Sequence, residues 1–401
     1  MEGMMNSRQR IIAALEHRES DRLPVDFGGT DCSSIHLTAY DKLRKLIGIE
    51  PRSIRLACLS QMVVDVDDEV QNCFGGDAKA LYFQPRRWKI WQSAWGIDVE
   101  TPELWTPERL SNGTWVIRNA KGVVVNECPP SGKYFDPVGF LLGGVESPEE
   151  IEGFAAVFER WDWPVACDES VEEYAARAKQ LYQSTDKAVV ASWRMHYLQS
   201  GQIMRGYEQF MVDLLTDEPM TRGILDRLHA VYMARTEKFL SQMADYADVI
   251  FLTDDLGTQT SALISPACYR EMIKPYWAEL IGLIKKYDKK VLMHSCGAIS
   301  ELIPDLIEMG VDAVNPVQIT ATGMSPARLK KEYGRDIAFW GGGVNTQGVL
   351  DKGTVQEVRD DVKRNVDIFA KGGGYVFTQV HNIQSDVPPE NIAAAYEAAL
   401  A

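Results

Sequence analysis

Short apolar runs of strand-forming residues alternate with longer amphipathic segments over the second half of the chain. The six runs span residues 187–193, 247–254, 290–296, 311–317, 337–341 and 375–381. The segments between them, such as 264–286 and 355–370, repeat apolar residues at every third and fourth position, which is the helical period. Strands that alternate with helices pair in parallel through right-handed crossovers. The pattern therefore predicts six β/α units of one parallel sheet.

Two further strand candidates precede these units, at 23–27 and 78–83. They bring the count to eight, the number of strands at which a parallel sheet closes into a barrel with a filled interior. An open doubly wound sheet is the alternative, but the first strand is not followed by the G-x-G-x-x-G turn of such folds. We predict an α/β fold of the TIM (β/α)8 barrel type, formed by a single domain over residues 1–401.

Residues 85–130 interrupt this alternation. Short alternating runs are joined there by turn pairs such as Asn112-Gly113 and Lys121-Gly122, which are typical of antiparallel hairpins. The stretch carries five of the ten tryptophans, namely Trp88, Trp91, Trp95, Trp105 and Trp115. We predict an antiparallel β-hairpin insertion within the barrel domain. Its tryptophans form either the small core of the hairpins or an aromatic wall over the barrel mouth.

The charge and hydropathy of the chain limit the kinds of molecule that it is expected to bind. The chain contains 42 Lys and Arg against 57 Asp and Glu, which gives a formal charge of −15. Nucleic acids and acidic membrane surfaces are bound chiefly through clustered basic residues, and the chain has no dense Lys/Arg stripe. The N-terminal segment mixes charged with apolar residues, and no apolar run approaches the roughly 18 residues of a membrane span. We expect a cytoplasmic protein that binds neither nucleic acid nor membranes.

The cysteines do not form a disulfide framework or a zinc finger. There are seven, widely scattered and never spaced as Cys-x-x-Cys: Cys32, Cys58, Cys73, Cys128, Cys167, Cys268 and Cys296. Most are expected to be buried, inert thiols. Cys296 is the exception, because it follows a strand.

Polar residues gather where the predicted strands end, which is the active-site end of such a barrel. In an extended segment, residues two apart point to the same face, so His294 and Cys296 project together. His381 follows the last strand at the same rim. Three convergent nitrogen and sulfur donors predict a catalytic zinc site with an open position. Each of the three residues is also compatible with a packed or hydrogen-bonded role at the rim.

Other strand ends supply further candidates. The adjacent carboxylates Asp254 and Asp255 alternate faces, so at most one looks along the barrel axis, as a general base or fourth metal ligand; alternatively, both cap loop amides. His196, Tyr197 and Gln318 follow two other strands and are candidates for binding substrate. His196 is also the third histidine ligand if His381 is not one. The remaining histidines, His17, His36 and His229, are expected at the surface.

The same segments resemble the uroporphyrinogen decarboxylase superfamily, most clearly over residues 187–399. The resemblance lies in Asp254-Asp255-Leu256-Gly257-Thr258-Gln259, Ile264-Ser265-Pro266 with Lys274-Pro275-Tyr276, His294-Ser295-Cys296-Gly297, and Val387-Pro388-Pro389-Glu390-Asn391-Ile392. It implies the barrel that the alternation predicts. It also implies one of two activities, because the superfamily contains the decarboxylase and zinc-dependent, cobalamin-linked methyltransferases.

This chain departs from the pattern of each branch at one place. The decarboxylase branch uses an arginine-rich N-terminal segment to bind an acidic porphyrinogen, whereas residues 22–30 carry only Arg22. The methyltransferase branch follows His-x-Cys with a later cysteine, whereas this chain has His381 in the segment 379–382. If His381 takes that place, zinc is bound by one thiolate and the site keeps a formal charge of about +1, which strengthens the metal as a Lewis acid.

These features predict a zinc-dependent methyltransferase. The resemblance implies that a methyl group moves between a small molecule and methylcobalamin, the corrinoid carried by a partner protein, and that the enzyme is a homodimer. The metal ligands would be His294, Cys296 and His381, with Asp254 or Asp255 as base. A decarboxylase-like lyase is the first alternative, and a non-catalytic binding protein on the same barrel is the second.

Overall fold

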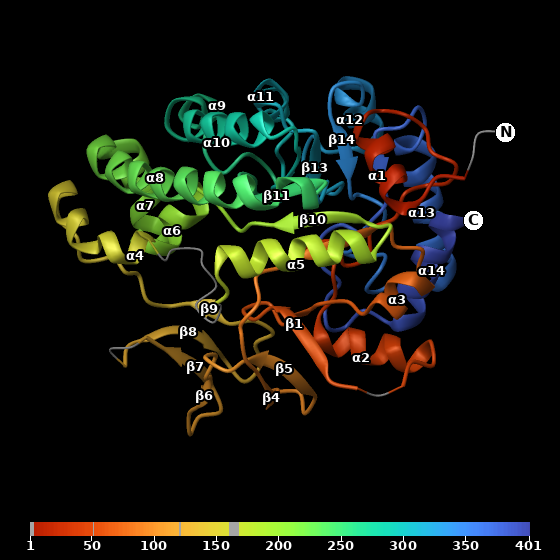
Figure 1. Cartoon of the computed structure of the whole chain (residues 1–401), viewed down its shortest axis with the longest axis horizontal. Helices are drawn as coiled ribbons and strands as arrows, with labels where there is room; N and C mark the ends of the chain where they lie inside the picture. The colour runs from red at the N-terminus through yellow and green to blue at the C-terminus, as the bar shows by residue number, and fades with distance from the viewer. Residues whose placement is uncertain (1–3, 51, 120–121, 160–167) are drawn as a thin grey trace.

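Seven parallel strands form a curled sheet at the centre of the molecule. The computed structural model describes residues 4–50, 52–119, 122–159 and 168–401. In sheet order, the strands are β15 (Tyr375–Val376), β14 (Ala338–Trp340), β13 (Ala313–Asn315), β12 (Lys290–His294), β11 (Val249–Thr253), β10 (Ala188–Ser192) and β3 (Ala78–Leu81). Helices connect the strands and cover the outside of the sheet (Figure 1). The sheet and its helices confirm the predicted α/β class and the barrel-like fold.

The segment around Val25 joins the two edge strands of this sheet. Val25 pairs in parallel with Phe377, next to β15, and the Asp26 N–H donates to the Phe377 carbonyl at 2.8 Å. On the other side, the Asp77 N–H next to β3 donates to the Val25 carbonyl at 2.7 Å. The predicted strand at 23–27 is therefore only a short bridging segment, because the chain turns into a loop directly after it. This segment nevertheless links the first and last strands.

The barrel interior is filled by side chains that alternate along the strands. They form one buried cluster of Ala78, Ala188, Val190, Val249, Phe251, Leu292, Ala313, Ala338, Trp340 and Val376. Helix α1 (Ser7–Leu15) adds Ile11, Ala14 and Leu15 to this cluster, and Cys32 belongs to it as well. Because every second strand residue points inward, the interior is a packed core and not a pore.

The covering helices bury one face each against the barrel. They include α5 (Val171–Ser184), α8 (Glu218–Met243), α10 (Lys274–Lys286), α11 (Ile303–Met309), α12 (Pro326–Tyr333), α13 (Val355–Phe369) and α14 (Pro389–Leu400). Helices α5 and α13 begin with capping boxes, in which Ser170 and Thr354 accept the N–H of the glutamate three residues later. None of the helices in the described part of the chain is long and apolar enough to cross a membrane.

Further helices lie between these elements. They are α2 (Leu37–Leu46), α3 (Asp68–Cys73), α4 (Ala155–Glu159), α6 (Leu198–Arg205), α7 (Tyr207–Thr216), α9 (Pro266–Cys268), the 3-10 helices η1 (Pro148–Phe154) and η2 (Ala244–Tyr246), and the π-helical η3 (Tyr269–Ile273). Helix α6 is the next element after β10, so its first residues lie near the carboxyl end of the sheet.

Two small sheets lie beside the barrel, below it in the view of Figure 1. One has the order β2 (Val63–Val64), β1 (Ile54–Cys58), β5 (Asp98–Pro102) and β4 (Trp88–Gln92); the other contains β6 (Glu108–Arg109), β7 (Trp115–Arg118), β8 (Val124–Cys128) and β9 (Asp136–Pro137). All neighbours are antiparallel except β1 and β5. The sheets thus draw strands from 54–64 and 136–137 as well as from the tryptophan-rich stretch.

Three of the tryptophans pack on one another in this region. The ring of Trp91 meets that of Trp105 edge to face at 4.8 Å and that of Trp115 at 5.3 Å. Trp95 instead contacts the ring of His36, next to the barrel, at 5.1 Å. These contacts favour a small hydrophobic core as the role of the tryptophans, with Trp95 as an attachment to the barrel.

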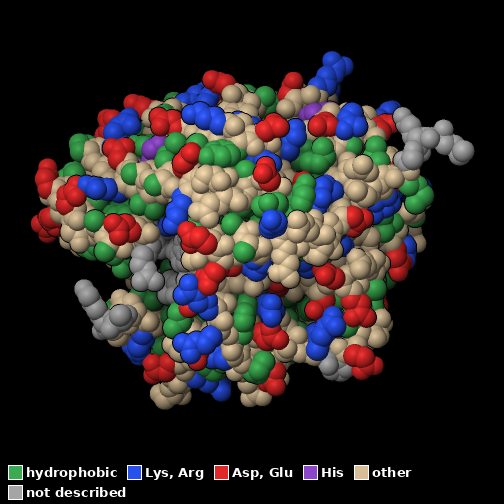
Figure 2. Space-filling model, in the orientation of Figure 1, with side chains coloured by type: hydrophobic (Ala, Val, Ile, Leu, Met, Phe, Trp, Pro, Cys, Tyr) green, Lys and Arg blue, Asp and Glu red, His purple; other side chains and the backbone are tan. Residues whose placement is uncertain are grey.

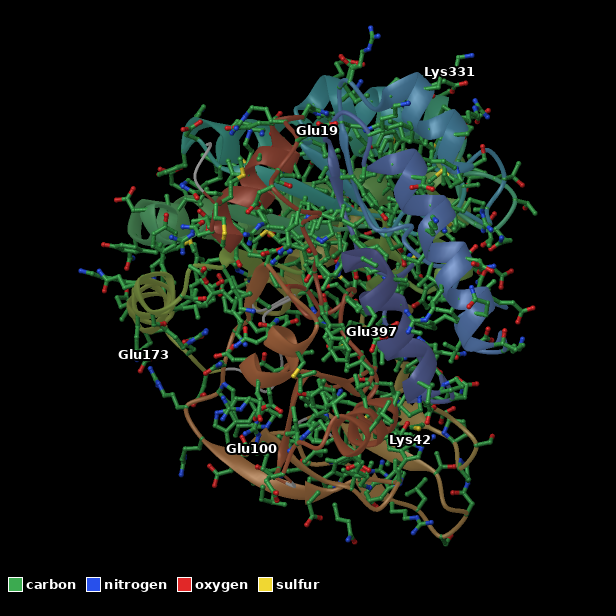
Figure 3. The ribbon with its side chains drawn as sticks, turned by 90° about the vertical axis from the view of Figure 1, so that its right-hand side faces the viewer. Glu19, Lys42, Glu100, Glu173, Lys331 and Glu397 are labelled. Carbon is green, nitrogen blue, oxygen red and sulfur yellow. The ribbon has the colours of Figure 1, made fainter. Side chains whose placement is uncertain are left out.

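Charged side chains are distributed over the outside of the molecule. On the face shown in Figure 2, basic side chains are interspersed with acidic ones and do not form a continuous stripe. Figure 3 labels six charged residues of the exterior, of which Glu100 is half-buried: Glu19, Lys42, Glu100, Glu173, Lys331 and Glu397. This distribution separates a charged exterior from the apolar barrel interior.

His36 is buried, contrary to the expectation that it lies at the surface. Its Nδ1 accepts the Thr38 N–H at 3.2 Å and so caps α2. Burial lowers the pKa of His36 from 6.5 to about 4. The sequence could not show this, because the apolar partners that cover His36 come from segments distant in the chain.

Replacing His36 with asparagine is expected to make the protein less sensitive to acid. Between the unfolded pKa of about 6.5 and the folded pKa, the unfolded chain binds the proton more tightly, so stability is complete above pH 6.5 and falls as pH drops toward 4. At pH 5 the loss amounts to about 2 kcal/mol. Asparagine keeps the helix cap without titrating. Denaturation midpoints at pH 7 and pH 5 should therefore differ less in His36→Asn than in the wild type; equal differences would contradict this assignment.

Candidate metal centre

The candidate residues lie at or after the carboxyl ends of three barrel strands. Asp255 follows β11, His294 is the last residue of β12, and His381 follows β15. The strand register pairs Thr253 with His294 and His294 with Asn315, so the ends of β11, β12 and β13 are level. Residues distant in sequence therefore meet at one end of the barrel, as the parallel arrangement predicts.

The buried imidazole of His294 is held in one orientation by Asn315. The His294 Nδ1 and the Asn315 Oδ1 lie 2.6 Å apart. The Asn315 amide is itself fixed, because its Nδ2 donates to the Trp340 carbonyl at 2.8 Å. The Asn315 oxygen therefore accepts, and the hydrogen of the neutral imidazole lies on Nδ1. This leaves the Nε2 lone pair available to a ligand, which is how metal-binding histidines are oriented.

Three candidate ligand atoms surround the Nε2 of His294. The Cys296 Sγ lies 3.4 Å from it, the Asp255 Oδ1 3.6 Å, and the Cys32 Sγ 3.9 Å. A tetrahedral zinc ion with bonds of about 2.0–2.3 Å separates its ligand atoms by about 3.3–3.8 Å. The donors are therefore spaced much as they are around zinc.

His294 is shared by two groups of candidate ligands. The ligand atoms of Cys32, His294 and His381 lie within 4.8 Å of one another, and so do those of Asp255, His294 and Cys296. The rings of His294 and His381 are 5.3 Å apart. The predicted ligands His294, Cys296 and His381 thus lie in one cluster, although His381 and Cys296 belong to different groups. Imidazole nitrogen, thiolate sulfur and carboxylate oxygen are all zinc ligands.

Cys32 is the member of the cluster that the sequence analysis missed. It lies in the loop after the bridging segment, and Asp26 fixes this loop by accepting the Gly29 N–H at 2.6 Å and the Trp340 Nε1–H at 2.7 Å. A Cβ on Gly29 would lie 2.5 Å from the Asp26 Oδ1, so the turn requires glycine. The signal was present, because a cysteine follows the first predicted strand just as Cys296 follows a later one.

An ion pair lies next to Cys32. The guanidinium of Arg194 contacts the carboxylate of Asp31. Burial raises the pKa of Asp31, but Arg194 and His294 outweigh it, so this pKa lies below its ordinary value. The positive charge of Arg194 therefore lies beside the cluster, and the carboxylate of Asp31 neutralises it.

Both thiols of the cluster are protonated unless a cation binds them. Burial raises the pKa of Cys32 well above its ordinary value, and the negative charge of Asp31 raises it further. Burial and the carboxylate of Asp255 do the same for the pKa of Cys296. A metal must displace these protons, so its affinity for the cluster is expected to increase with pH.

The two adjacent aspartates have different surroundings. The carboxylate of Asp254 is fully buried and accepts the backbone N–H groups of Tyr197, Leu198 and Gln199 at 2.9–3.1 Å, as well as the Trp277 Nε1–H at 3.1 Å. The Asp254 carboxylate is thus engaged by four donors, and it anchors the start of α6. The structure therefore favours Asp255 over Asp254 for a role in the chemistry.

Asp255 faces the cluster and remains accessible. Its side chain is 41% exposed, and its Oδ1 accepts the Cys296 N–H at 2.9 Å. Burial raises the pKa of Asp255, but His294 and this hydrogen bond lower it more, so the carboxylate is favoured. The ionised carboxylate of Asp255 thus lies beside the candidate ligands.

The three residues predicted to bind substrate are placed differently. The side chain of Tyr197 is fully buried, with its hydroxyl 2.7 Å from the His229 Nδ1, so it does not line an open site. The partly buried His196 has its Nδ1 3.1 Å from the Ser200 Oγ. Only Gln318 adjoins the cluster, because its Oε1 accepts the Gly297 N–H at 2.9 Å and so holds the turn after Cys296.

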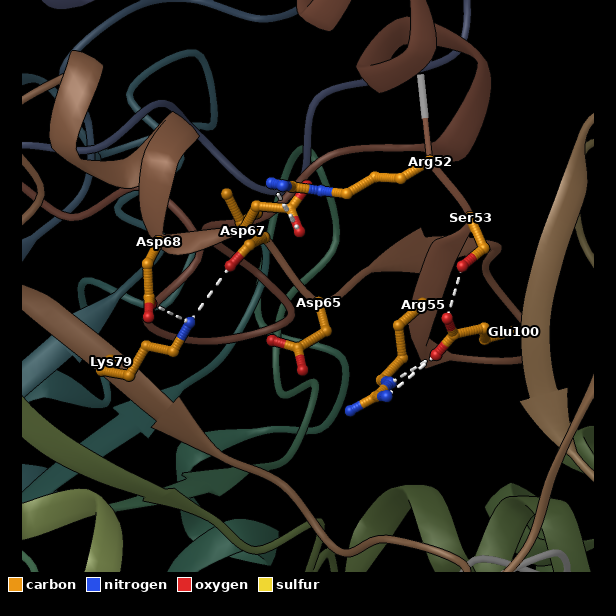
Figure 4. A pocket seen from close by; sticks show the side chains of 9 residues that line it. Arg52, Ser53, Arg55, Asp65, Asp67, Asp68, Lys79 and Glu100 are labelled. Atoms are coloured by element: carbon orange, nitrogen blue, oxygen red, sulfur yellow. Dashed lines mark hydrogen bonds and ion pairs between the residues drawn. The ribbon is translucent and has the colours of Figure 1, made fainter. Parts of the chain in front are cut away.

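A surface cavity of about 310 Å³ lies elsewhere, outside strands β1 and β3 (Figure 4). Its charged lining residues largely pair with one another, since Arg55 contacts Glu100 at 2.9 Å and Lys79 contacts Asp68 at 2.7 Å. The nine residues that line it include none of the candidate metal ligands. This cavity and the cluster of candidate ligands are therefore separate sites.

Comparison with known proteins establishes the family. The family described as uroporphyrinogen decarboxylase (URO-D) matches residues 188–401, which is more than half of the chain. The chain belongs to the uroporphyrinogen decarboxylase family. The match runs from β10 to the C-terminus and includes His294, Cys296 and His381, whereas Cys32 lies outside it.

Curated relatives within the uroporphyrinogen decarboxylase family are distant. A uroporphyrinogen decarboxylase of Chromohalobacter salexigens is 24% identical over 211 residues, which cover 50% of this chain and 54% of the relative. One of Legionella pneumophila (strain Corby) is 23% identical over 208 residues, with the same coverage of both chains. The chain thus spans about half the length of the curated relatives it matches.

A solved structure is similar in fold over nearly the whole chain, beyond the segment that the family match covers. A methyltransferase from Methanosarcina mazei superimposes with a TM-score of 0.59 at 16% sequence identity and covers 98% of both chains. At this identity the comparison establishes the barrel-like fold, including the N-terminal part that carries Cys32.

Proposed function

We propose that this member of the uroporphyrinogen decarboxylase family is a zinc-dependent methyltransferase. It would move a methyl group between a small molecule and a corrinoid carried by a partner protein. The observation that carries the proposal is the set of sulfur, nitrogen and oxygen donors around the His294 Nε2. Thiols and imidazoles in this combination are ligands that zinc prefers, which fits a metal-assisted reaction better than a metal-free decarboxylation.

Each side chain of the cluster has a separate task in this proposal. His294, Cys296 and His381 would hold the ion, and Asn315 would keep the His294 ring in the tautomer that binds metal. Bound zinc would polarise the oxygen, nitrogen or sulfur atom that carries or receives the methyl group. Asp255 would accept the proton that a protic methyl acceptor loses.

The N-terminal arginine argues against the decarboxylase alternative. Arg22 donates to the two carboxylate oxygens of Asp77 at 2.7 and 2.8 Å and to the Leu23 carbonyl at 2.9 Å. Its guanidinium is thus engaged in holding the bridging segment against β3. A porphyrinogen with several carboxylates would not find in Arg22 the cation that it needs.

Methyl transfer by the purified protein is expected to depend on zinc. The test uses a corrinoid protein and a panel of methoxy, methylamino and thiol compounds, with the corrinoid absorbance spectrum as the readout. Chelation should abolish the transfer that one of these compounds supports, and added zinc should restore it. Glu19→Gln serves as the control, because Glu19 is exposed and belongs to neither group of candidate ligands.

A different pair of results would contradict the proposal. If the metal-replete protein transfers no methyl group but converts uroporphyrinogen to coproporphyrinogen after chelation, the decarboxylase alternative holds. If it binds no zinc and shows neither activity, the barrel serves as a binding protein.

A further inference from the structure

We propose that Cys32 is a second thiolate ligand of the metal, alongside Cys296. This inference rests on the proposed function, since it concerns the same zinc site. It assigns a role to a residue outside the matched family segment, on a loop that is brought to the cluster only by closure of the barrel.

The first argument concerns the single lone pair on the His294 Nε2. The Sγ atoms of Cys296 and Cys32 lie 3.4 and 3.9 Å from this nitrogen. A neutral imidazole nitrogen with one lone pair can accept one good hydrogen bond, from either thiol, and the Cys296 thiol has the Asp255 carboxylate as a second acceptor. A cation bound to the nitrogen and to both sulfurs would satisfy all three atoms at once.

The second argument concerns the position of Cys32. The sulfur of Cys32 lies in one group with the ligand atoms of His294 and His381. Cys296 is not a member of that group, so Cys32 is its source of sulfur. Cys32 is 8% exposed and packs with the residues of the barrel interior. The loop that carries it is fixed by the buried carboxylate of Asp26. The ligand atoms of Cys32 and Cys296 belong to different groups, so the two side chains must move toward one another to share an ion with His294.

A second thiolate changes the charge of the site. One thiolate leaves zinc with a formal charge of about +1, whereas Cys32 and Cys296 together cancel the charge of the ion. The sequence pattern alone predicts the formal charge of about +1, because His381 stands where the family resemblance implies a cysteine. In three dimensions, Cys32 restores the missing sulfur from the opposite end of the sequence.

Cobalt substitution tests this inference without an activity assay. The intensity of sulfur-to-cobalt charge-transfer absorption follows the number of thiolates bound to Co²⁺. The full-length protein is titrated with Co²⁺ alone, as wild type and as Cys32→Ser, Cys32→Ala, Cys296→Ser and Cys128→Ser. Cys128 is the matched control, because it is buried like Cys32 but lies on β8 in the small sheets.

Substitution of either Cys32 or Cys296 is expected to remove about half of the charge-transfer intensity. Zinc affinity should fall at least about tenfold in each case, whereas Cys128→Ser should match the wild type. Cys32 variants with wild-type absorption and wild-type zinc affinity would overturn the inference and leave the zinc function intact. A wild-type protein that binds neither Co²⁺ nor Zn²⁺ would overturn the proposed function itself. Circular dichroism confirms that each variant is folded.

Discussion

Replacing His294 with alanine is expected to lower zinc affinity by about 100-fold or more and to abolish methyl transfer. The effect should exceed that of any other single substitution in the cluster, because His294 belongs to both groups of candidate ligands. The Cys296 sulfur and the Asp255 carboxylate both lie close to the His294 Nε2, at 3.4 and 3.6 Å. Competition with a chromogenic chelator measures the affinity.

The matched control for this variant is His17→Asn. His17 lies outside the cluster and has a positive φ of 54°, a conformation that asparagine tolerates better than most residues. Its zinc affinity and methyl transfer should equal those of the wild type. If His294→Ala retained wild-type zinc affinity while remaining folded, the cluster would not be the metal centre.

Replacing Asp254 with alanine is expected to destabilise the protein by about 4 kcal/mol or more. The substitution leaves four buried donors without their acceptor, among them three consecutive N–H groups at the start of α6. Each unsatisfied buried donor costs about 1–3 kcal/mol, and any water that enters the space recovers part of that cost. Urea denaturation and the yield of soluble protein measure the effect.

The neighbouring substitution Asp255→Ala provides the comparison. Asp255 is partly exposed and accepts one backbone N–H, from Cys296, so its loss should cost less than about 1.5 kcal/mol. It should instead slow methyl transfer to a protic acceptor. Equal stabilities of the two alanine variants would show that Asp254 does not anchor α6.

The division of roles between these aspartates could not be read from their positions in the sequence. Strand alternation indicates that two adjacent residues point to opposite faces, but not which face is lined by backbone donors. That depends on α6 and α10, which pack around Asp254 from different parts of the chain. The same reason explains Tyr197, which follows a strand as predicted but is covered by the neighbouring helices.

The sequence by itself determined the periodic elements and the rim on which chemistry is concentrated. Alternating strands and helices specify a parallel barrel, and the residues after each strand must then meet at one end, which brings His294, Cys296 and His381 near one another. These inferences need only local periodicity and one topological rule.

Only the tertiary structure shows which side chains from distant parts of the chain adjoin the candidate ligands. Cys32 reaches His294 because the segment around Val25 bridges the first and last strands, and Arg22 is unavailable to a substrate because it pairs with Asp77. Such contacts join residues far apart in the chain and depend on how buried polar groups find their partners, which no local pattern encodes.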